Sequence, residues 1–218
     1  MAKYPVTPGL RKKRICLDSV LLLGCLTLLL LALDFPILTA NQALAATQER
    51  HFFGPGRIIG QLEFPHKSNE VKGGQYDRYY ILEHEDWYAW CGVNHYGLFW
   101  QSGELDAVKN DPSVPLVPLV VSNWANGAVL VICNDPSIVQ VELRLRERPS
   151  WKLFTFKESQ AADHCFVIRY QIETMPWEGE FQLRGYDAAG KLVYESAAPE
   201  SWTEYEARLE EVLKEVWS

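Results

Sequence analysis

The sequence predicts a mainly β protein: an antiparallel β-sandwich or barrel-like domain with a C-terminal amphipathic α-helix, preceded by an N-terminal transmembrane or signal helix. Three observations predict it: short apolar stretches with period two, frequent turn residues between them, and one long apolar run near the amino terminus. Of the 218 residues, 48% are hydrophobic and 22% charged, which is typical of a globular protein and excludes a disordered chain or a collagen.

A basic cluster followed by an apolar run marks the amino terminus. Arg11, Lys12, Lys13 and Arg14 precede residues 19–33, fifteen positions without a charge. Basic residues beside an apolar segment stay on the cytoplasmic side of a membrane, so the rest of the chain is expected outside. Fifteen helical residues reach about 22 Å, less than the hydrocarbon core of about 30 Å, whereas the longer stretch from Ile15 to Leu38 suffices to span it.

This leader has two expected fates. Retained, it makes the chain a single-pass protein of the cell membrane. Alternatively, Ala43-Leu44-Ala45 before a polar stretch is typical of a signal-peptidase site, and cleavage near Ala45 would make the protein secreted. In both cases residues 1–46 are expected to form a basic tail with an anchor or signal peptide, and residues 47–218 an extracytoplasmic β-rich domain.

The net charge of −7 is divided unevenly along the chain. Residues 1–46 carry five basic and two acidic side chains, whereas residues 47–218 carry 16 basic and 26 acidic ones, a net charge of −10. Binding DNA or RNA requires a positive surface that releases counterions. A nucleic-acid partner is therefore not expected.

Alternation of apolar and polar residues predicts strands with one face in a core. In residues 139–146, for example, Val141 and Leu143 alternate with Glu142 and Arg144. The same pattern appears in residues 166–173, and further strands are predicted at residues 57–64, 78–83, 87–91, 97–101, 116–122, 128–133, 151–157, 180–186 and 191–195.

Turn residues separate these stretches. Residues 187–190, Asp-Ala-Ala-Gly, predict a hairpin in which Gly190 takes a positive φ. The tetrapeptide Asn-Asp-Pro-Ser occurs at residues 110–113 and again at 134–137. The two copies either mark a duplicated hairpin or reflect the general preference of Asx-Pro for turns.

The carboxyl terminus departs from the β pattern. After Pro199, Ser201 and Glu204 predict a capping box, and apolar residues recur at helical spacing as far as Val216. We expect this helix to pack its apolar stripe on the β core, with a docking surface for a partner as the alternative.

The three cysteines beyond the leader, Cys91, Cys133 and Cys165, allow one disulfide and one free thiol in an exported domain. Three pairings are possible and the sequence does not choose between them; a bridge between Cys133 and Cys165 is one interpretation, and three reduced core thiols are another. No catalytic cysteine is expected, because His164 and Cys165 are strand neighbours and point to opposite faces.

The sequence contains no catalytic motif that we recognise. The densest polar group, His84, Asp86 and His95, matches no metal-binding spacing. No nucleophile elbow, phosphate-binding loop, dinucleotide fingerprint or zincin helix occurs. We therefore expect neither an enzyme nor a metal or cofactor site.

Aromatic residues are the remaining candidates for binding. Nine of them fall within residues 76–100, and the candidate ligand-binding residues are Trp87, Tyr88, Trp90 and Trp100, because exposed rings stack against sugars. Strand alternation places rings on both faces of this hairpin. The alternative is that they fill the core of a two-layer sandwich and that the C-terminal helix covers the outer ones.

The leader, the β-rich exterior and residues 134–143 and 184–195 together resemble small, uncharacterised bacterial membrane-attached extracytoplasmic β-sandwich proteins. This resemblance carries no catalytic or binding residue with it. The expected function is that of a non-enzymatic, membrane-attached interaction or sensor/accessory domain with an envelope or membrane protein as partner. The alternatives are a cell-wall glycan-binding module and an envelope hydrolase of unrecognised type.

Overall fold

The computed structural model describes residues 8–32, 37–63, 76–122, 126–147, 150–172 and 176–216. Its helices are α1 (Pro8–Ala32), α2 (Ala40–Arg50) and α3 (Glu200–Val216). Its strands are β1 (Arg57–Leu62), β2 (Arg78–His84), β3 (Trp87–Tyr96), β4 (Phe99–Lys109), β5 (Leu116–Ser122), β6 (Asn126–Cys133), β7 (Gln140–Glu147), β8 (Leu153–Glu158), β9 (Ala161–Ala162), β10 (Cys165–Gln171), β11 (Pro176–Tyr186) and β12 (Leu192–Glu195).

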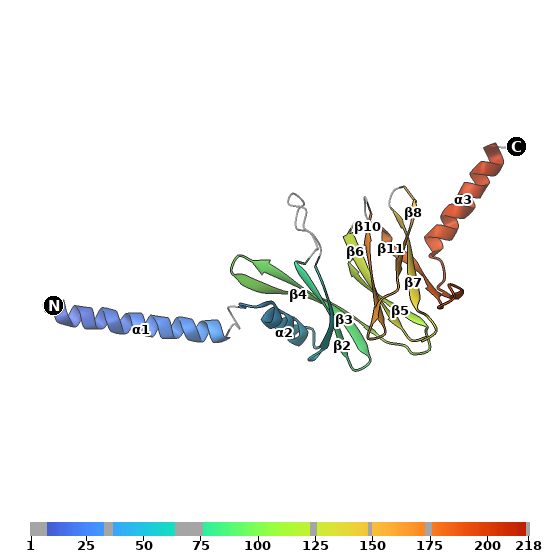
Figure 1. Cartoon of the computed structure of the whole chain (residues 1–218). Coiled ribbons are helices and arrows are strands. Elements are labelled where there is room, and N and C mark those ends of the chain that lie inside the picture. The colour runs from blue at the N-terminus through green and yellow to red at the C-terminus, as the bar shows by residue number, and fades with distance from the viewer. Residues whose placement is uncertain are drawn as a thin grey trace.

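These strands form three antiparallel sheets. The first has the order β1-β2-β3-β4, the second β5-β6-β10-β9 and the third β12-β11-β7-β8. Figure 1 shows them stacked one on another, with α1 projecting from one end of the stack and α3 from the other. The prediction of a mainly β, antiparallel, sandwich-like fold with a C-terminal helix is confirmed, but there are three layers of sheet instead of two.

The second sheet is buried on both faces. In β6, Leu130 and Ile132 pack against the first sheet, whereas Val129 and Val131 pack against the third. A strand with one wet face alternates apolar and polar residues, but residues 128–132 are apolar without interruption. The three-layer arrangement follows from this run, because both faces of the strand must leave water.

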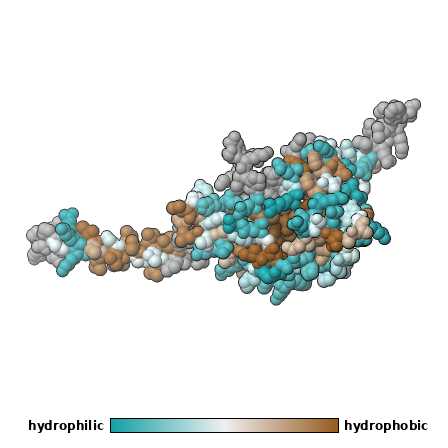
Figure 2. Space-filling view, in the orientation of Figure 1, coloured by the Kyte–Doolittle hydropathy of each residue, from teal (hydrophilic) through white to brown (hydrophobic). Residues whose placement is uncertain are grey.

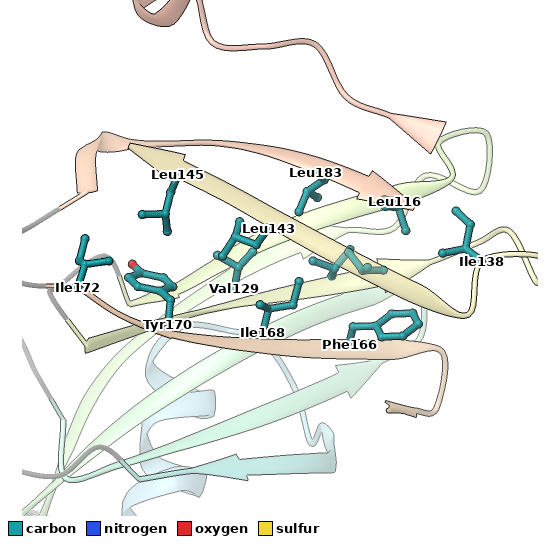
Figure 3. Packing of buried hydrophobic residues seen from close by; sticks show 12 residues of the cluster. Leu116, Val129, Ile138, Leu143, Leu145, Phe166, Ile168, Tyr170, Ile172 and Leu183 are labelled. Atoms are coloured by element: carbon teal, nitrogen blue, oxygen red, sulfur yellow. The ribbon is translucent and has the colours of Figure 1, made fainter. Parts of the chain in front are cut away.

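The core between the second and third sheets follows the predicted alternation. Leu143 and Leu145 of β7 face Phe166, Ile168 and Tyr170 of β10, as Figure 3 shows. The polar residues of β7 that alternate with these leucines point to the outer face of the third sheet. There Glu142, although only 5% exposed, accepts a hydrogen bond from the Tyr186 hydroxyl at 3.1 Å and lies 3.2 Å from the ammonium of Lys157.

The outer face of the first sheet is covered by α2. Ala43 and Leu44 are buried against Tyr80 and Leu82 of β2. A capping box between Thr39 and the side chain of Gln42 starts this helix. The helix crosses the expected boundary between residues 46 and 47, so the folded body begins before that boundary. The covering helix is α2 and not the C-terminal one, which Figure 1 shows at the other end of the stack.

The leader forms α1, in which the apolar side chains are exposed. Among the residues that the structure describes, no helix combines the length and mean hydropathy that crossing a bilayer requires. The expected apolar span runs through residues 33–36, which lie outside the described residues.

The two Asn-Asp-Pro-Ser turns lie against each other. The side-chain amide of Asn110 donates to Oδ1 of Asn134 at 2.9 Å, and that of Asn134 donates back to Oδ1 of Asn110 at 3.0 Å. In both turns the aspartate accepts a hydrogen bond from the backbone N–H of the serine two residues later, at 2.9 Å. Neither turn closes a hairpin: the first leads from β4 to β5 and the second from β6 to β7, so each carries the chain to the next sheet.

The C-terminal helix contacts the body through its first turns. Trp202 is buried, and the ring of Tyr205 stacks on Trp151 with 4.3 Å between centroids. The predicted capping box is wrong, because α3 already begins at Glu200 and the Ser201 hydroxyl donates to Glu180 instead. Figure 1 shows the rest of α3 pointing away from the sheets. The side chains of the predicted stripe beyond Arg208 lie outside the described residues.

Shortening Leu44 to alanine should destabilise the protein. Leu44 is 5% exposed between α2 and the first sheet, and removing a buried leucine side chain typically costs about 2–4 kcal/mol of unfolding free energy. Urea denaturation of the full chain measures this loss. Glu49→Ala on the exposed side of the same helix is the control, with an expected change below about 0.5 kcal/mol. Equal effects of the two substitutions would contradict the packing of α2.

The paired turns should be energetically coupled. Asn134→Ala removes an amide that also donates to the carbonyl oxygens of Asp111 and Val114, and we expect a loss of about 1–3 kcal/mol. A double-mutant cycle with Asn110→Ala, followed by urea denaturation, isolates the contribution of the pair. Losses that add within about 0.5 kcal/mol would show that the two amides do not interact.

Candidate functional site

The structure places the four candidate ligand-binding residues on different surfaces. Tyr88 is buried between the first and second sheets, and its hydroxyl donates to Glu83 at 3.2 Å. Trp90 packs against the same core, whereas Trp100 packs on the opposite face of the sheet, beside α2. Trp87 is 40% exposed at the start of β3. The four rings therefore do not form one row on which a sugar could stack.

Trp90 belongs to an aromatic cluster inside the protein. Its ring lies 5.5 Å from that of Tyr79 and 6.1 Å from that of Tyr76, measured between centroids. The Tyr76 ring lies across two glycines, since a Cβ atom at Gly92 or Gly103 would come within 2.4 Å of it. Burial, helped by the charge of Glu104, raises the pKa of Tyr76 to about 12. The cluster therefore forms part of the protein core, and the two glycines, one in β3 and one in β4, leave room for the Tyr76 ring.

The exposed aromatic and apolar side chains gather instead where β3 turns into β4. We call residues 96–99 the hairpin tip. Tyr96 is 77% exposed, Leu98 83% and Phe99 37%, and Gly97 takes a φ of +62° in the turn. Sequence analysis missed this surface, although the signal was present: the turn consists of Tyr-Gly-Leu-Phe, whereas exposed turns are usually rich in Asn, Asp, Ser and Pro.

Below the hairpin tip lies a group of amphipathic side chains. The ring of His95 is 5.0 Å from that of Trp100, and the guanidinium carbon of Arg78 is 5.2 Å from the centroid of the same indole. The backbone N–H of Trp100 donates to the carbonyl oxygen of Ile37 at 2.8 Å. The segment that follows α1 is thus joined to the base of the hairpin tip.

The residues of the polar group His84, Asp86 and His95 do not meet. His84 pairs with Trp87 at one end of β3, and His95 lies eight residues farther along the strand, a distance of about 26 Å at the usual rise. Asp86 forms an ion pair with Lys109 at 3.1 Å. Within the described part of the chain, no three side chains of the metal-binding types converge.

All five cysteines are free thiols in the structure. Burial raises the pKa of Cys91 to about 11 and that of Cys165 to about 12. A nucleophilic cysteine needs the opposite shift, because the thiolate is the reactive species. These two cysteines are core residues.

Comparison with known proteins gives the family of the chain. Residues 36–205 match DUF5044, a domain of unknown function, and the chain belongs to this family. The match begins one residue before Ile37 and ends at Tyr205, so it contains α2, the three sheets and the first turns of α3 but not α1. No curated protein and no solved structure matches the chain.

The buried thiols should make stability fall at alkaline pH. Because the pKa of Cys91 is about 11 in the folded state and about 9 when exposed, its contribution is complete below pH 9 and is lost as the pH rises toward 11. We expect the loss of unfolding free energy between pH 8 and pH 10 to be about 1 kcal/mol smaller in Cys91→Ala than in the unchanged chain. Cys25→Ser, at an exposed position in α1, is the control. Identical pH profiles of the unchanged chain and Cys91→Ala would contradict the raised pKa.

Proposed function

We propose that this protein is an extracytoplasmic interaction or accessory domain held at a membrane by its leader. One observation carries the proposal. The large aliphatic side chains of α1 from Ile15 to Leu29 are between 51% and 72% exposed, so the described part of the domain does not cover them. Apolar surface of this extent is unfavourable in water, and a lipid phase is the environment that would bury it.

The position of α2 favours a retained leader. Ala43 and Leu44 precede the predicted cleavage point at Ala45 and are buried against the first sheet. Cleavage there would remove half of α2 from the body and expose Tyr80 and Leu82. The family match also begins at residue 36, before this helix. Both observations support a folded domain that starts near Ile37 and remains attached to α1.

The orientation follows from the basic cluster at residues 11–14. Basic residues at one end of an apolar helix stay in the cytoplasm, which places the sheets on the other side of the membrane. The third sheet and α3 then lie farthest from the bilayer, since Figure 1 shows them at the end of the stack opposite α1. We propose that the polar outer face of the third sheet, with Arg144, Lys157 and Arg184, is presented to an envelope or membrane protein. An interaction role is favoured over catalysis because the sequence carries no recognisable catalytic motif.

Charges placed in α1 should release the protein from membranes. In the unchanged full chain we expect nearly all of the protein to stay in the membrane pellet after alkaline carbonate washing. Leu22→Asp combined with Leu28→Asp should move most of it to the supernatant, because each buried carboxylate costs about 2.5–3.5 kcal/mol. Val193→Asp, at a 41% exposed position in β12, is the matched control and should stay in the pellet.

Two results would reject this function. One is an unchanged chain that is soluble without detergent and absent from the pellet. The other is a reporter fused after Ser218 that faces the cytosol, since that result would reverse the proposed orientation.

A further inference from the structure

The hairpin tip is an apolar surface that the described part of the chain leaves uncovered. Tyr96 and Leu98 are 77% and 83% exposed at the end of two long paired strands. In Figure 1 the β3–β4 hairpin points toward the end of the body from which α1 projects. Figure 2 shows hydrophobic surface at this end of the body and along α1, whereas much of the visible face of the sheets is hydrophilic.

The hairpin tip is held close to the leader by the backbone. The Trp100 N–H donates to the Ile37 carbonyl oxygen at 2.8 Å, and the N–H of Leu38 donates to the Gln42 side chain at 2.9 Å. Five residue steps separate Ala32, the last residue of α1, from Ile37. They extend over at most about 17 Å. Ile37, to which Trp100 is hydrogen-bonded, must therefore lie within this distance of the end of α1.

The chemistry of the hairpin tip suits the boundary between lipid and water. Tyrosine and tryptophan are enriched at this boundary because they combine an apolar ring with a polar group. Tyr96 and Trp100 supply such rings, Leu98 supplies the aliphatic side chain at the turn, and Arg78 lies over the Trp100 indole. The hairpin tip itself, Tyr-Gly-Leu-Phe, contains no carboxylate that anionic headgroups would repel.

We propose that the hairpin tip inserts into the headgroup and upper acyl region of the bilayer in which the leader is anchored. This inference rests on the proposed membrane attachment and adds a second contact, which fixes how the sheets stand on the membrane. A lipid surface fits better than a protein partner, because a stable protein interface buries about 800 Å² on each side and the hairpin tip offers three side chains. Because the leader already anchors the chain, the hairpin tip needs to insert only a short way.

The test places a nitroxide label on the hairpin tip of the full chain in lipid vesicles. Leu98→Cys is labelled in a chain that also carries Cys16→Ser and Cys25→Ser, because Cys91 and Cys165 are buried and react slowly. The partly exposed Cys133 makes the same chain without Leu98→Cys the background control. Ala189→Cys, in the exposed turn between β11 and β12, is the matched control position. Flotation of the vesicles is measured on the same samples and tests attachment separately.

The collision rates of the label with oxygen and with a water-soluble nickel chelate give its depth. We expect the label at residue 98 to lie about 5–10 Å below the phosphates and the label at residue 189 to be in water. A chain that floats with the vesicles but whose label at residue 98 is as accessible to nickel as that at residue 189 would overturn the insertion and leave the attachment standing. Spin–spin broadening without oxygen contact would show that a second copy covers the hairpin tip, and would also overturn it. A chain that does not float would refute the attachment and the insertion together.

Discussion

The second sheet has to bury both of its faces, and the rest of the architecture depends on this requirement. The uninterrupted apolar run in β6 leaves no face for water, so a sheet must lie on each side of it. The chain has to change sheets after β4 and again after β6 to build these layers. Both of these changes use the same Asn-Asp-Pro-Ser turn, and the hydrogen bonds between Asn110 and Asn134 join the two turns. The chain changes sheets again after β8 and after β10.

The outer faces of the first and third sheets differ in polarity. In the first sheet, Tyr80 and Leu82 lie on the outer face, which needs an apolar cover and receives it from α2. In the third sheet, the outer face is polar, and its buried carboxylate Glu142 lies near the cations of Lys157 and Arg184. The outer face of the first sheet, on the side of the leader, is therefore apolar beneath α2, and the outer face of the third sheet is polar. This asymmetry follows from the sequence, because apolar and polar residues alternate in the strands of the third sheet, whereas both faces of β2 carry apolar residues.

The sequence could predict the strands but not how they are layered. Period-two alternation located β7 and β10 and the sides that they bury, and Gly190 takes the expected positive φ of 76°. Alternation does not say which sheets face each other, so the third layer was missed even though residues 128–132 indicated a strand buried on both faces. The helix α2 was missed because a small-residue motif around Ala43 resembles a cleavage site. The aromatic rings lie on both faces of the β3–β4 hairpin, as alternation predicts, but the sequence does not reveal which of them are covered or that a β-bulge between Cys91 and Val93 shifts the register.

The short connection between leader and body limits how far the body can lie from α1. Ile37 is hydrogen-bonded to Trp100, and Ala40 is already buried, so the folded body begins within about 17 Å of the end of α1. A linker of tens of residues would let the body move well away from α1, whereas five residue steps keep Ile37 within this distance. The hairpin tip and α2 are thereby confined to the side nearest the leader. The third sheet and the start of α3, where Arg146 lies over the buried Trp202, are at the opposite end of the stack, which this connection does not confine.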